Sequence, residues 1–216
     1  MPCAFDLEAI DAIIFDLGGV IINIRYANTI EALGRLCEFS VESLYAQHSQ
    51  VSLFDDYETG RLTSAEFRQG LRQLLCLTCL DQEIDAAWNA MLLDIPRQRI
   101  DLLKEVRQRK RIFLLSNTNE IHKLAFDQIF ADSLGSTSGT ISDLFEQAYY
   151  SHLMGDRKPN PSIFQRILDE NGLNPGRTLF IDDTAQHIAG AQSVGLQTCH
   201  LAPGLSLESL NLLGNS

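Results

Sequence analysis

The sequence is poor in basic residues and has no long apolar stretch. Lys and Arg number 17 against 28 Asp and Glu, which gives a formal net charge of −11 over 216 residues. Binding to a nucleic-acid backbone needs a basic face, so we predict no nucleic-acid partner. No apolar run approaches the ~18–20 residues that cross a bilayer. The segment MPCAFDLEAID also carries acids where a secretory signal carries basic residues, so we expect a soluble, cytoplasmic protein with no membrane partner.

Cysteine is also sparse, and its spacing is irregular. The chain has five cysteines, an odd number that does not predict a disulfide framework: Cys3, Cys37, Cys76, Cys79 and Cys199. Cys76 and Cys79 form a CxxC pair, but a zinc site needs a second pair of ligands and a redox site needs a thioredoxin-like βαβ context. The surroundings LLCLTCL supply neither, so we expect both residues to be buried structural thiols.

Apolar residues make up 45% of the chain, which is enough for one large domain or a core with a modest insertion. Short apolar runs bounded by turn residues recur, and most are followed by segments of helical periodicity. This alternation predicts an α/β fold with a Rossmann-like, mainly parallel sheet covered by helices on both faces. The predicted strands are Ala12–Phe15, Arg111–Leu115, Glu146–Tyr150, Thr178–Ile181 and Gln197–Leu201.

The first and second predicted strands are separated by about 95 residues, far more than one crossover helix needs. This stretch carries helix-start signals of its own, a capping box at Thr63–Glu66 and an acidic start at Asp81. We therefore predict an inserted helical cap over residues 23–96, and a core made of residues 1–22 and 97–216.

The first predicted strand ends in IIFDLGGVI, which places Asp16 at its carboxyl end and two glycines directly after it. Ligands bind at this edge of an open α/β sheet, and glycines allow a tight backbone turn that exposes N–H and C=O groups. An Asp at such a place is equally often a helix cap or a turn former. This motif alone leaves both interpretations open.

Three other strand ends or adjoining loops carry polar residues that complete the pattern. They are Ser116, Asn117 and Thr118 in RIFLLSNTN, Lys158 in GDRKPN, and the pair Asp182 and Asp183 in TLFIDDT. Lys158 is one of only four lysines and alone sits in such a loop; the alternative for it is an ordinary surface lysine. A carboxylate, a hydroxyl, a cation and an acidic pair in this order form a constellation far more specific than any one member.

The four motifs resemble, in order, those of the haloacid dehalogenase superfamily, and the resemblance covers essentially the whole chain, including a helical cap inserted after the first motif. FDLGGV, LLSNTN, GxxKP and LFIDD look most like the phosphatase branch that includes sugar-1-phosphate phosphatases. The resemblance implies that Asp16 attacks phosphorus to form an aspartyl-phosphate and that the cofactor is Mg²⁺. The implied metal ligands are the Asp16 carboxylate, the Gly18 main-chain carbonyl, Asp182 and, directly or through water, Asp183.

The physical chemistry of phosphoryl transfer agrees with these roles. A phosphate monoester is anionic and repels a carboxylate nucleophile, so the site needs positive charge, which Mg²⁺ and Lys158 supply. Hard oxygen ligands suit that ion. Lys158 keeps Asp16 ionised, while Ser116 Oγ stabilises charge on the phosphoryl oxygens. We expect Asp16, Ser116 and Lys158 to be catalytic, and a small phosphorylated metabolite to be bound by Ser116, Asn117, Lys158 and Glu58.

One position departs from the family pattern. Most phosphatases of the family have a second Asp two residues after the nucleophile, which serves as general acid and base, and here that residue is Gly18. Loss of such a group typically costs ~10²–10⁴ in rate. An acidic leaving group depends less on protonation, so we hypothesise a preference for sugar 1-phosphates or aryl phosphates. The main alternative is a binding or regulatory protein on the same fold with little turnover.

Other chemistries of the superfamily fit less well. A metal-independent 2-haloacid dehalogenase generally lacks the acidic pair at Asp182 and Asp183. A phosphonate hydrolase needs a lysine in the cap, and no lysine lies between Asn23 and Arg99. A phosphomutase is expected to keep the acid/base Asp that Gly18 replaces.

Substrate choice is expected to lie in the cap, because the core motifs contact only the phosphoryl group and the metal. The segment LFDDYETGRL, which includes Glu58 and Arg61, resembles a loop that faces the active site in related capped phosphatases. Glu58 is then a ligand for sugar hydroxyls; the equal alternative is that Glu58 and Arg61 are solvated surface charges. We expect the cap to open and close about hinges near Asn23–Tyr26 and Asp94–Arg97. The sequence carries no signal for an oligomeric state.

Overall fold

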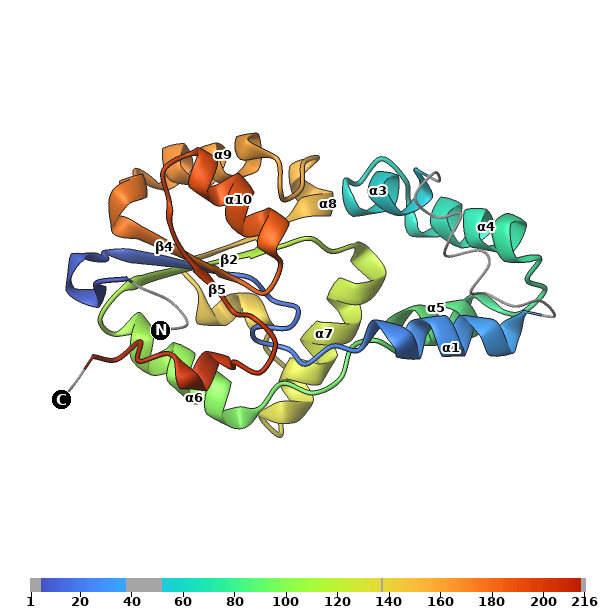
Figure 1. Cartoon of the computed structure of the whole chain (residues 1–216). Helices are drawn as coiled ribbons and strands as arrows, with labels where there is room; N and C mark the ends of the chain where they lie inside the picture. The colour runs from blue at the N-terminus through green and yellow to red at the C-terminus, as the bar shows by residue number, and fades with distance from the viewer. Residues whose placement is uncertain (1–4, 38–51, 137, 215–216) are drawn as a thin grey trace.

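The computed structural model describes residues 5–37, 52–136 and 138–214. Its centre is a five-stranded sheet in the order β3-β2-β1-β4-β5, in which every neighbouring pair is parallel (Figure 1). The predicted α/β fold is confirmed, and every strand overlaps one of the predicted apolar runs. The strands are β1 (Ala12–Phe15), β2 (Arg111–Ser116), β3 (Gln147–Tyr150), β4 (Thr178–Asp182) and β5 (Gln197–His200).

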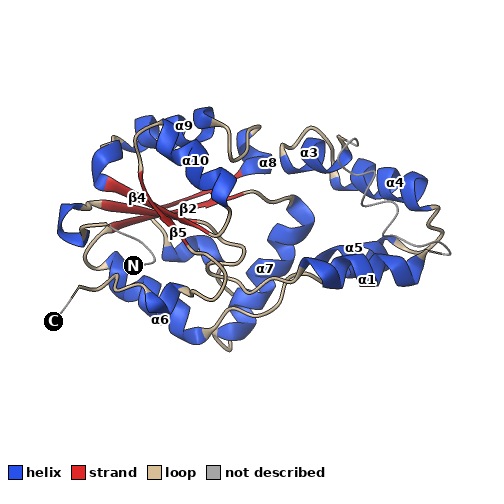
Figure 2. Cartoon of the chain, viewed as in Figure 1, coloured by secondary structure: helices blue, strands red, loops and turns tan. Residues whose placement is uncertain are grey.

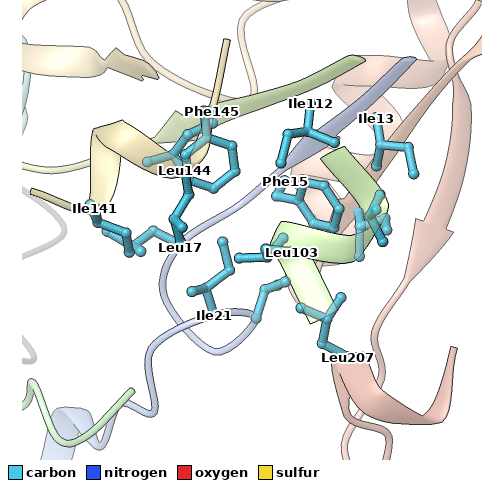
Figure 3. Close-up of a cluster of buried hydrophobic side chains, with 14 of the residues drawn as sticks. Ile13, Phe15, Leu17, Ile21, Leu103, Ile112, Ile141, Leu144, Phe145 and Leu207 are labelled. Atoms are coloured by element: carbon cyan, nitrogen blue, oxygen red, sulfur yellow. The ribbon is translucent and has the colours of Figure 1, made fainter. Parts of the chain in front are cut away.

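Helices cover both faces of the sheet (Figure 2), so the central strands β1 and β4 are buried along their whole length. On one face Phe15 packs in a cluster with Leu103 and Phe126 (Figure 3 shows part of this cluster). On the other face Ile14 packs with Phe164 and Ile188. The covering helices are α6 (Arg97–Arg107) and α7 (Glu120–Ser133) on the first face, and α9 (Pro161–Asn171) and α10 (Ala185–Ser193) on the second.

Shorter elements fill the connections between strands and helices. A one-turn helix, α8 (Ser151–Met154), follows β3 directly and leads into the loop that carries Lys158. The 3₁₀ helices are η1 (Leu7–Ala9), η3 (Ile141–Leu144), η4 (Pro175–Arg177) and η5 (Leu207–Ser209). Within the described part of the chain, none of the helices is both long and apolar enough to cross a bilayer.

The segment between β1 and α6 forms a helical layer beside the sheet. Both sequence signals in it are confirmed: the Thr63–Glu66 capping box is formed, and a helix begins at Asp81. The helices enclose a cluster that also contains Ile121 of α7, and in it the centroid of the Phe67 ring lies 4.1 Å from that of Tyr57 and 5.0 Å from that of Trp88. They are α1 (Tyr26–Leu36), α3 (Leu53–Glu58), α4 (Ser64–Leu75) and α5 (Asp81–Asn89).

Two chain segments connect this helical layer to the sheet, and they pair with each other. Asn23 N donates to Asp94 O at 2.9 Å, and Leu93 N donates to Asn23 O at 2.9 Å. An antiparallel bridge joins Ile24 to Leu92. We propose these paired linkers as the boundary between the core, residues 1–22 and 97–216, and the cap, residues 23–96.

Two expectations about cysteine are wrong. Cys199 in β5 is disulfide-bonded, which the odd number and irregular spacing of the cysteines did not predict. Cys76 is exposed rather than buried, because it caps the end of α4 with a left-handed backbone (φ 54°). Cys79 is partly buried, and both members of the CxxC pair are free thiols. Cys3 lies outside the described residues.

We expect Phe67→Ala to lower the free energy of unfolding by ~3–5 kcal/mol, because truncating a buried aromatic ring leaves a cavity in the cap cluster. Phe67 is fully buried there. Urea unfolding followed by the fluorescence of Trp88, the chain's single tryptophan, measures the loss. Leu124→Ala, at a residue 70% exposed, is the control and should change stability by no more than about 0.5 kcal/mol. Equal effects of the two variants would contradict this packing.

Candidate active site

The carboxyl ends of the central strands bring the predicted polar residues to one edge of the sheet. Asp16 follows β1 directly, and its N–H donates to Ile181 O of β4 at 2.9 Å. Ser116 ends β2 and Asp182 ends β4. The chain runs from β1 to β2 and β3 on one side, then returns to β4 on the other side of β1. The three residues therefore lie at the point where strand order reverses, which is where open α/β sheets bind ligands.

Lys158 is fully buried between two of these carboxylates. Its Nζ donates to Asp16 Oδ1 at 2.5 Å and to Asp182 Oδ2 at 2.7 Å. The same Nζ lies 5.4 Å from the centre of the Phe180 ring. The alternative of an ordinary surface lysine is therefore wrong. A buried charge is tolerated only when it is paired, and here two partners share it.

The loop that carries Lys158 is positioned by Asn117 and by α10. Asn117 Nδ2 donates to Lys158 O, and Lys158 N donates to Asn117 Oδ1, each at 2.9 Å. A Cβ at Gly190 in α10 would lie 2.2 Å from Pro159 O, so only glycine permits this close packing. The Asn117 side chain thus holds the lysine loop through both of its polar atoms, a role that the sequence motif did not reveal.

The charges at this edge shift one another's protonation. Burial raises the pKa of Asp16, and the charges of Asp182 and Asp183 add to the rise, while Lys158 opposes it. Burial also works to raise the pKa of Asp182, but Lys158 and His187 outweigh it and hold that pKa at about 2. Burial lowers the pKa of Lys158, and the two carboxylates more than reverse this, so the amine stays protonated.

Asp16, Asp182 and Asp183 form a three-carboxylate cluster in which one oxygen from each residue lies within 4.8 Å of the other two. Burial and the Asp182 charge raise the pKa of Asp183. One ammonium group faces three carboxylates, so negative charge is in excess at the cluster. Hard carboxylate oxygens at this spacing fit a divalent cation of the Mg²⁺ type.

The turn after β1 packs directly against this cluster. Gly19 has a positive φ of 75°, and a Cβ there would lie 2.1 Å from Asp183 Oδ2. Only a residue without a side chain lets the carboxylate approach the backbone so closely. Gly18, whose carbonyl is a predicted metal ligand, is the preceding residue of the same turn.

Several residues that the motifs did not predict as site residues form hydrogen bonds with the acidic pair, Asp182 and Asp183. Thr184 N donates to Asp182 Oδ1 at 2.8 Å, and Thr184 Oγ1 donates to Asp183 Oδ1 at 3.1 Å. His187 Nδ1 lies 3.0 Å from Asp182 Oδ2, and His200 Nε2 lies 3.0 Å from Asp183 O. The sequence offered a signal for His187, because this residue lies in the first turn of the helix that follows the DDT motif and is therefore near Asp182.

The predicted phosphate-binding hydroxyl lies at the same edge. Ser116 is 3% exposed, and its Oγ donates to Asn117 O at a long 3.5 Å. The loop beyond it is held by Ser151, whose Oγ accepts from Thr118 N at 2.9 Å and donates to Thr118 O at 3.0 Å. The role of Ser116 in binding phosphate stays a prediction.

The cap residues named from the sequence divide into two groups. Glu58 pairs with Arg157 of the core, with 3.1 Å between Glu58 Oε2 and Arg157 Nη2, and Asp55 pairs with the same guanidinium. Arg61 instead pairs with Asp56 within the cap and is largely exposed, which agrees with a solvated charge. The structure therefore pairs Glu58 with the core residue directly before Lys158, whereas Arg61 makes its ion pair within the cap and lines a pocket together with Arg157 and Lys158.

Comparison with known proteins gives consistent matches over most of the chain. A family model described as haloacid dehalogenase-like hydrolase matches residues 10–195. D-ribitol-5-phosphate phosphatase from Bacteroides thetaiotaomicron is 27% identical over 186 residues, which cover 86% of this chain and 89% of that protein.

Solved structures give the same result. A HAD family enzyme from Bacteroides thetaiotaomicron is 34% identical with a TM-score of 0.86, over 96% of this chain and 99% of that one. A structure of that enzyme in complex with magnesium and inorganic phosphate is also 34% identical, with a TM-score of 0.83 over 95% and 100% of the two chains. L-2-haloacid dehalogenase from Xanthobacter autotrophicus, at 18% identity, a TM-score of 0.57 and coverage of 88% and 76%, shares the fold.

The family model spans strands β1 to β4, the inserted helices and all four polar motifs, in agreement with the resemblance seen in the sequence. The chain therefore belongs to the haloacid dehalogenase-like hydrolase family.

Proposed function

We propose that this protein is a magnesium-dependent phosphatase that hydrolyses a small phosphate monoester through an aspartyl-phosphate on Asp16. The observation that carries the proposal is the Lys158 ammonium held 2.5 Å from Asp16 and 2.7 Å from Asp182, at the edge of the sheet that also presents Asp183. A nucleophilic carboxylate, a fixed cation and an acidic pair together are what transfer of an anionic phosphoryl group requires.

In this proposal each residue has a distinct task. An Asp16 oxygen attacks phosphorus in line with the leaving oxygen, and water later releases phosphate from the acyl phosphate. Lys158 offsets the repulsion between the ester and Asp16, and Ser116 Oγ donates to a phosphoryl oxygen. Asp16, the Gly18 carbonyl, Asp182 and Asp183 would hold Mg²⁺, which supplies further positive charge to the phosphoryl oxygens.

The relatives support this assignment. The matched protein from Bacteroides thetaiotaomicron is named a D-ribitol-5-phosphate phosphatase, and a solved HAD family enzyme of that organism binds magnesium and inorganic phosphate. Both match this chain over most of their length. These names favour a phosphate ester of a small polyhydroxylated molecule as substrate here.

Gly18 refines the substrate class. A Cβ at Gly18 would lie 3.3 Å from Ile24 Cδ1, so a longer side chain here requires Ile24 to move. Because the core has no carboxylate at this position, esters with acidic leaving groups, which depend least on proton donation, are favoured. We propose sugar 1-phosphates as the preferred class, since the anomeric oxygen is a better leaving group than a primary alkoxide.

We expect Asp16→Asn to lower phosphate release from p-nitrophenyl phosphate by roughly 10³-fold or more, because the amide is a poor nucleophile. Steady-state assays with and without Mg²⁺ measure this, and wild-type activity should be lost when a chelator removes the metal. Asp11→Asn is the control, since Asp11 lies before the opposite end of β1 and pairs with Arg177 on the surface.

The alternatives give different outcomes in the same assays. A binding or regulatory protein on this fold would bind Mg²⁺ or phosphate without turnover. A 2-haloacid dehalogenase would release chloride from 2-chloropropionate without added metal. Either result would contradict the proposed phosphatase activity.

We expect kcat/KM for glucose 1-phosphate to exceed that for glucose 6-phosphate by about tenfold or more, because each 1.4 kcal/mol gained from the better leaving group is tenfold in rate. Phosphate release from the two esters at matched Mg²⁺ concentration measures the ratio. D-ribitol 5-phosphate, the ester in the relative's name, is the third substrate. A preference for either primary ester would refute the sugar 1-phosphate class while leaving the phosphatase activity in place.

A further inference from the structure

Gly18 leaves the reacting edge of the core without the usual proton donor for the leaving group. The carboxylates that the described structure gathers there are otherwise engaged. Asp16 is the nucleophile and contacts Lys158, and Asp182 accepts from Lys158, Thr184 N and His187. Asp183 belongs to the same metal-ligand cluster. A proton for an alcohol leaving group must therefore come from another element.

Glu58 of the cap carries a carboxyl group close to this edge. It contacts Arg157, the residue directly before Lys158, with 3.1 Å between Glu58 Oε2 and Arg157 Nη2. This contact lacks hydrogen-bond alignment: among the described residues, Glu58 Oε2 is buried and has no hydrogen-bond partner. A buried carboxyl oxygen to which no donor is aligned keeps its hydrogen-bonding capacity for a ligand.

The residues on either side of Glu58 in the sequence contact the core. Tyr57 Oη accepts a hydrogen bond from Ile121 N at 3.1 Å. Gly60, with φ 69°, approaches the core so closely that a Cβ would lie 2.1 Å from His152 O. Glu58 lies between these two contacts, so the end of α3 is held against the core rather than extended into solvent.

The charges that act on Glu58 come from the core as well as from its own helix. Arg157, His187 of α10 and Lys158 of the lysine loop all favour its ionised form and so lower its pKa, while Asp55 of α3 raises it. Together with the 3.1 Å contact to Arg157, these charges place Glu58 beside the lysine loop.

We propose that Glu58 is a catalytic residue that donates the proton to the leaving-group oxygen, in the position left open by Gly18; this inference rests on the proposed phosphatase function. In the first step Asp16 forms an O–P bond, the ester P–O bond breaks with its electron pair on the leaving oxygen, and that oxygen takes the Glu58 proton. In the second step Glu58 carboxylate takes a proton from water, the water oxygen bonds to phosphorus, and Asp16 leaves as carboxylate. The sum is ester plus water giving alcohol plus phosphate.

The protonation of Glu58 suits this role. Burial is the largest influence and raises its pKa, Asp55 adds to the rise, and Arg157, His187 and Lys158 oppose it without cancelling it. A raised pKa keeps more of the group protonated near neutral pH than in an exposed glutamate. Since the acid form is needed in the first step, kcat/KM for an alcohol ester falls as pH rises through the pKa of Glu58.

The test compares Glu58→Gln with wild type on two kinds of ester, using kcat/KM, which excludes the later hydrolysis of the acyl phosphate. One is p-nitrophenyl phosphate, whose leaving group needs no proton. The other is whichever of glucose 1-phosphate, glucose 6-phosphate and D-ribitol 5-phosphate the wild type hydrolyses best. We expect a loss of ~10²–10⁴ on the sugar or polyol ester, and a change below about fivefold on the aryl ester. The high-pH fall in wild-type kcat/KM should disappear in the variant.

Two further variants separate proton donation from cap docking. Asp55→Asn removes a neighbouring carboxylate that pairs with the same Arg157, and should change kcat/KM on both esters by less than about fivefold. Glu58→Asp keeps an acid on a shorter side chain and should retain more activity on the sugar or polyol ester than Glu58→Gln.

The outcomes distinguish the inference from the function on which it rests. Equal losses on the aryl and alcohol esters in Glu58→Gln, or an effect on KM alone, would assign Glu58 to binding or docking and overturn the inference. Wild-type hydrolysis of the aryl ester with none of the alcohol esters would overturn it too. No phosphate release from any ester by wild type would instead overturn the proposed function.

Discussion

The arrangement of this protein depends on one buried ammonium group. Lys158 Nζ contacts both Asp16 and Asp182 with no exposure to solvent, and neither side of this pairing is tolerated without the other. Strand ends from opposite sides of the switch point must meet for the pairing to form. The two hydrogen bonds between Asn117 and the Lys158 backbone and the close packing of Pro159 on Gly190 both fix the position of the lysine loop, and with it the position of the ammonium group.

The same pairing explains the character of the site. A single lysine leaves the three carboxylates with excess negative charge, which suits a divalent cation; in the proposed function the cation and the lysine together offset the charge of an anionic ester. The inserted helices add what the sheet edge does not have. Through Arg157 they place Glu58 beside the lysine loop, so the proposed reacting groups of the core and the proposed cap residue meet at adjacent positions of the chain, Arg157 and Lys158.

Much of the fold was predictable because buried parallel strands read as continuous apolar runs. The grouping of Asp16, Ser116 and Asp182 was equally predictable, since parallel strands end at a common edge, and Lys158 was found from its loop motif. Side-chain direction was not predictable: Asn117 faces the lysine backbone, and His187 reaches Asp182 across a turn. Contacts between distant segments, such as the pairing of Arg157 with Glu58, leave no periodic pattern in the sequence.

The paired linkers at Asn23 and Asp94 have a mechanical consequence. The two segments are hydrogen-bonded to each other, so they form one paired connection rather than two independent ones. The aromatic cluster packs the helices beyond this connection against one another and against Ile121 of α7. Any movement of the proposed cap about this connection would carry Glu58 and the rest of the cap together, so that opening the site and removing part of its wall would be one geometric event.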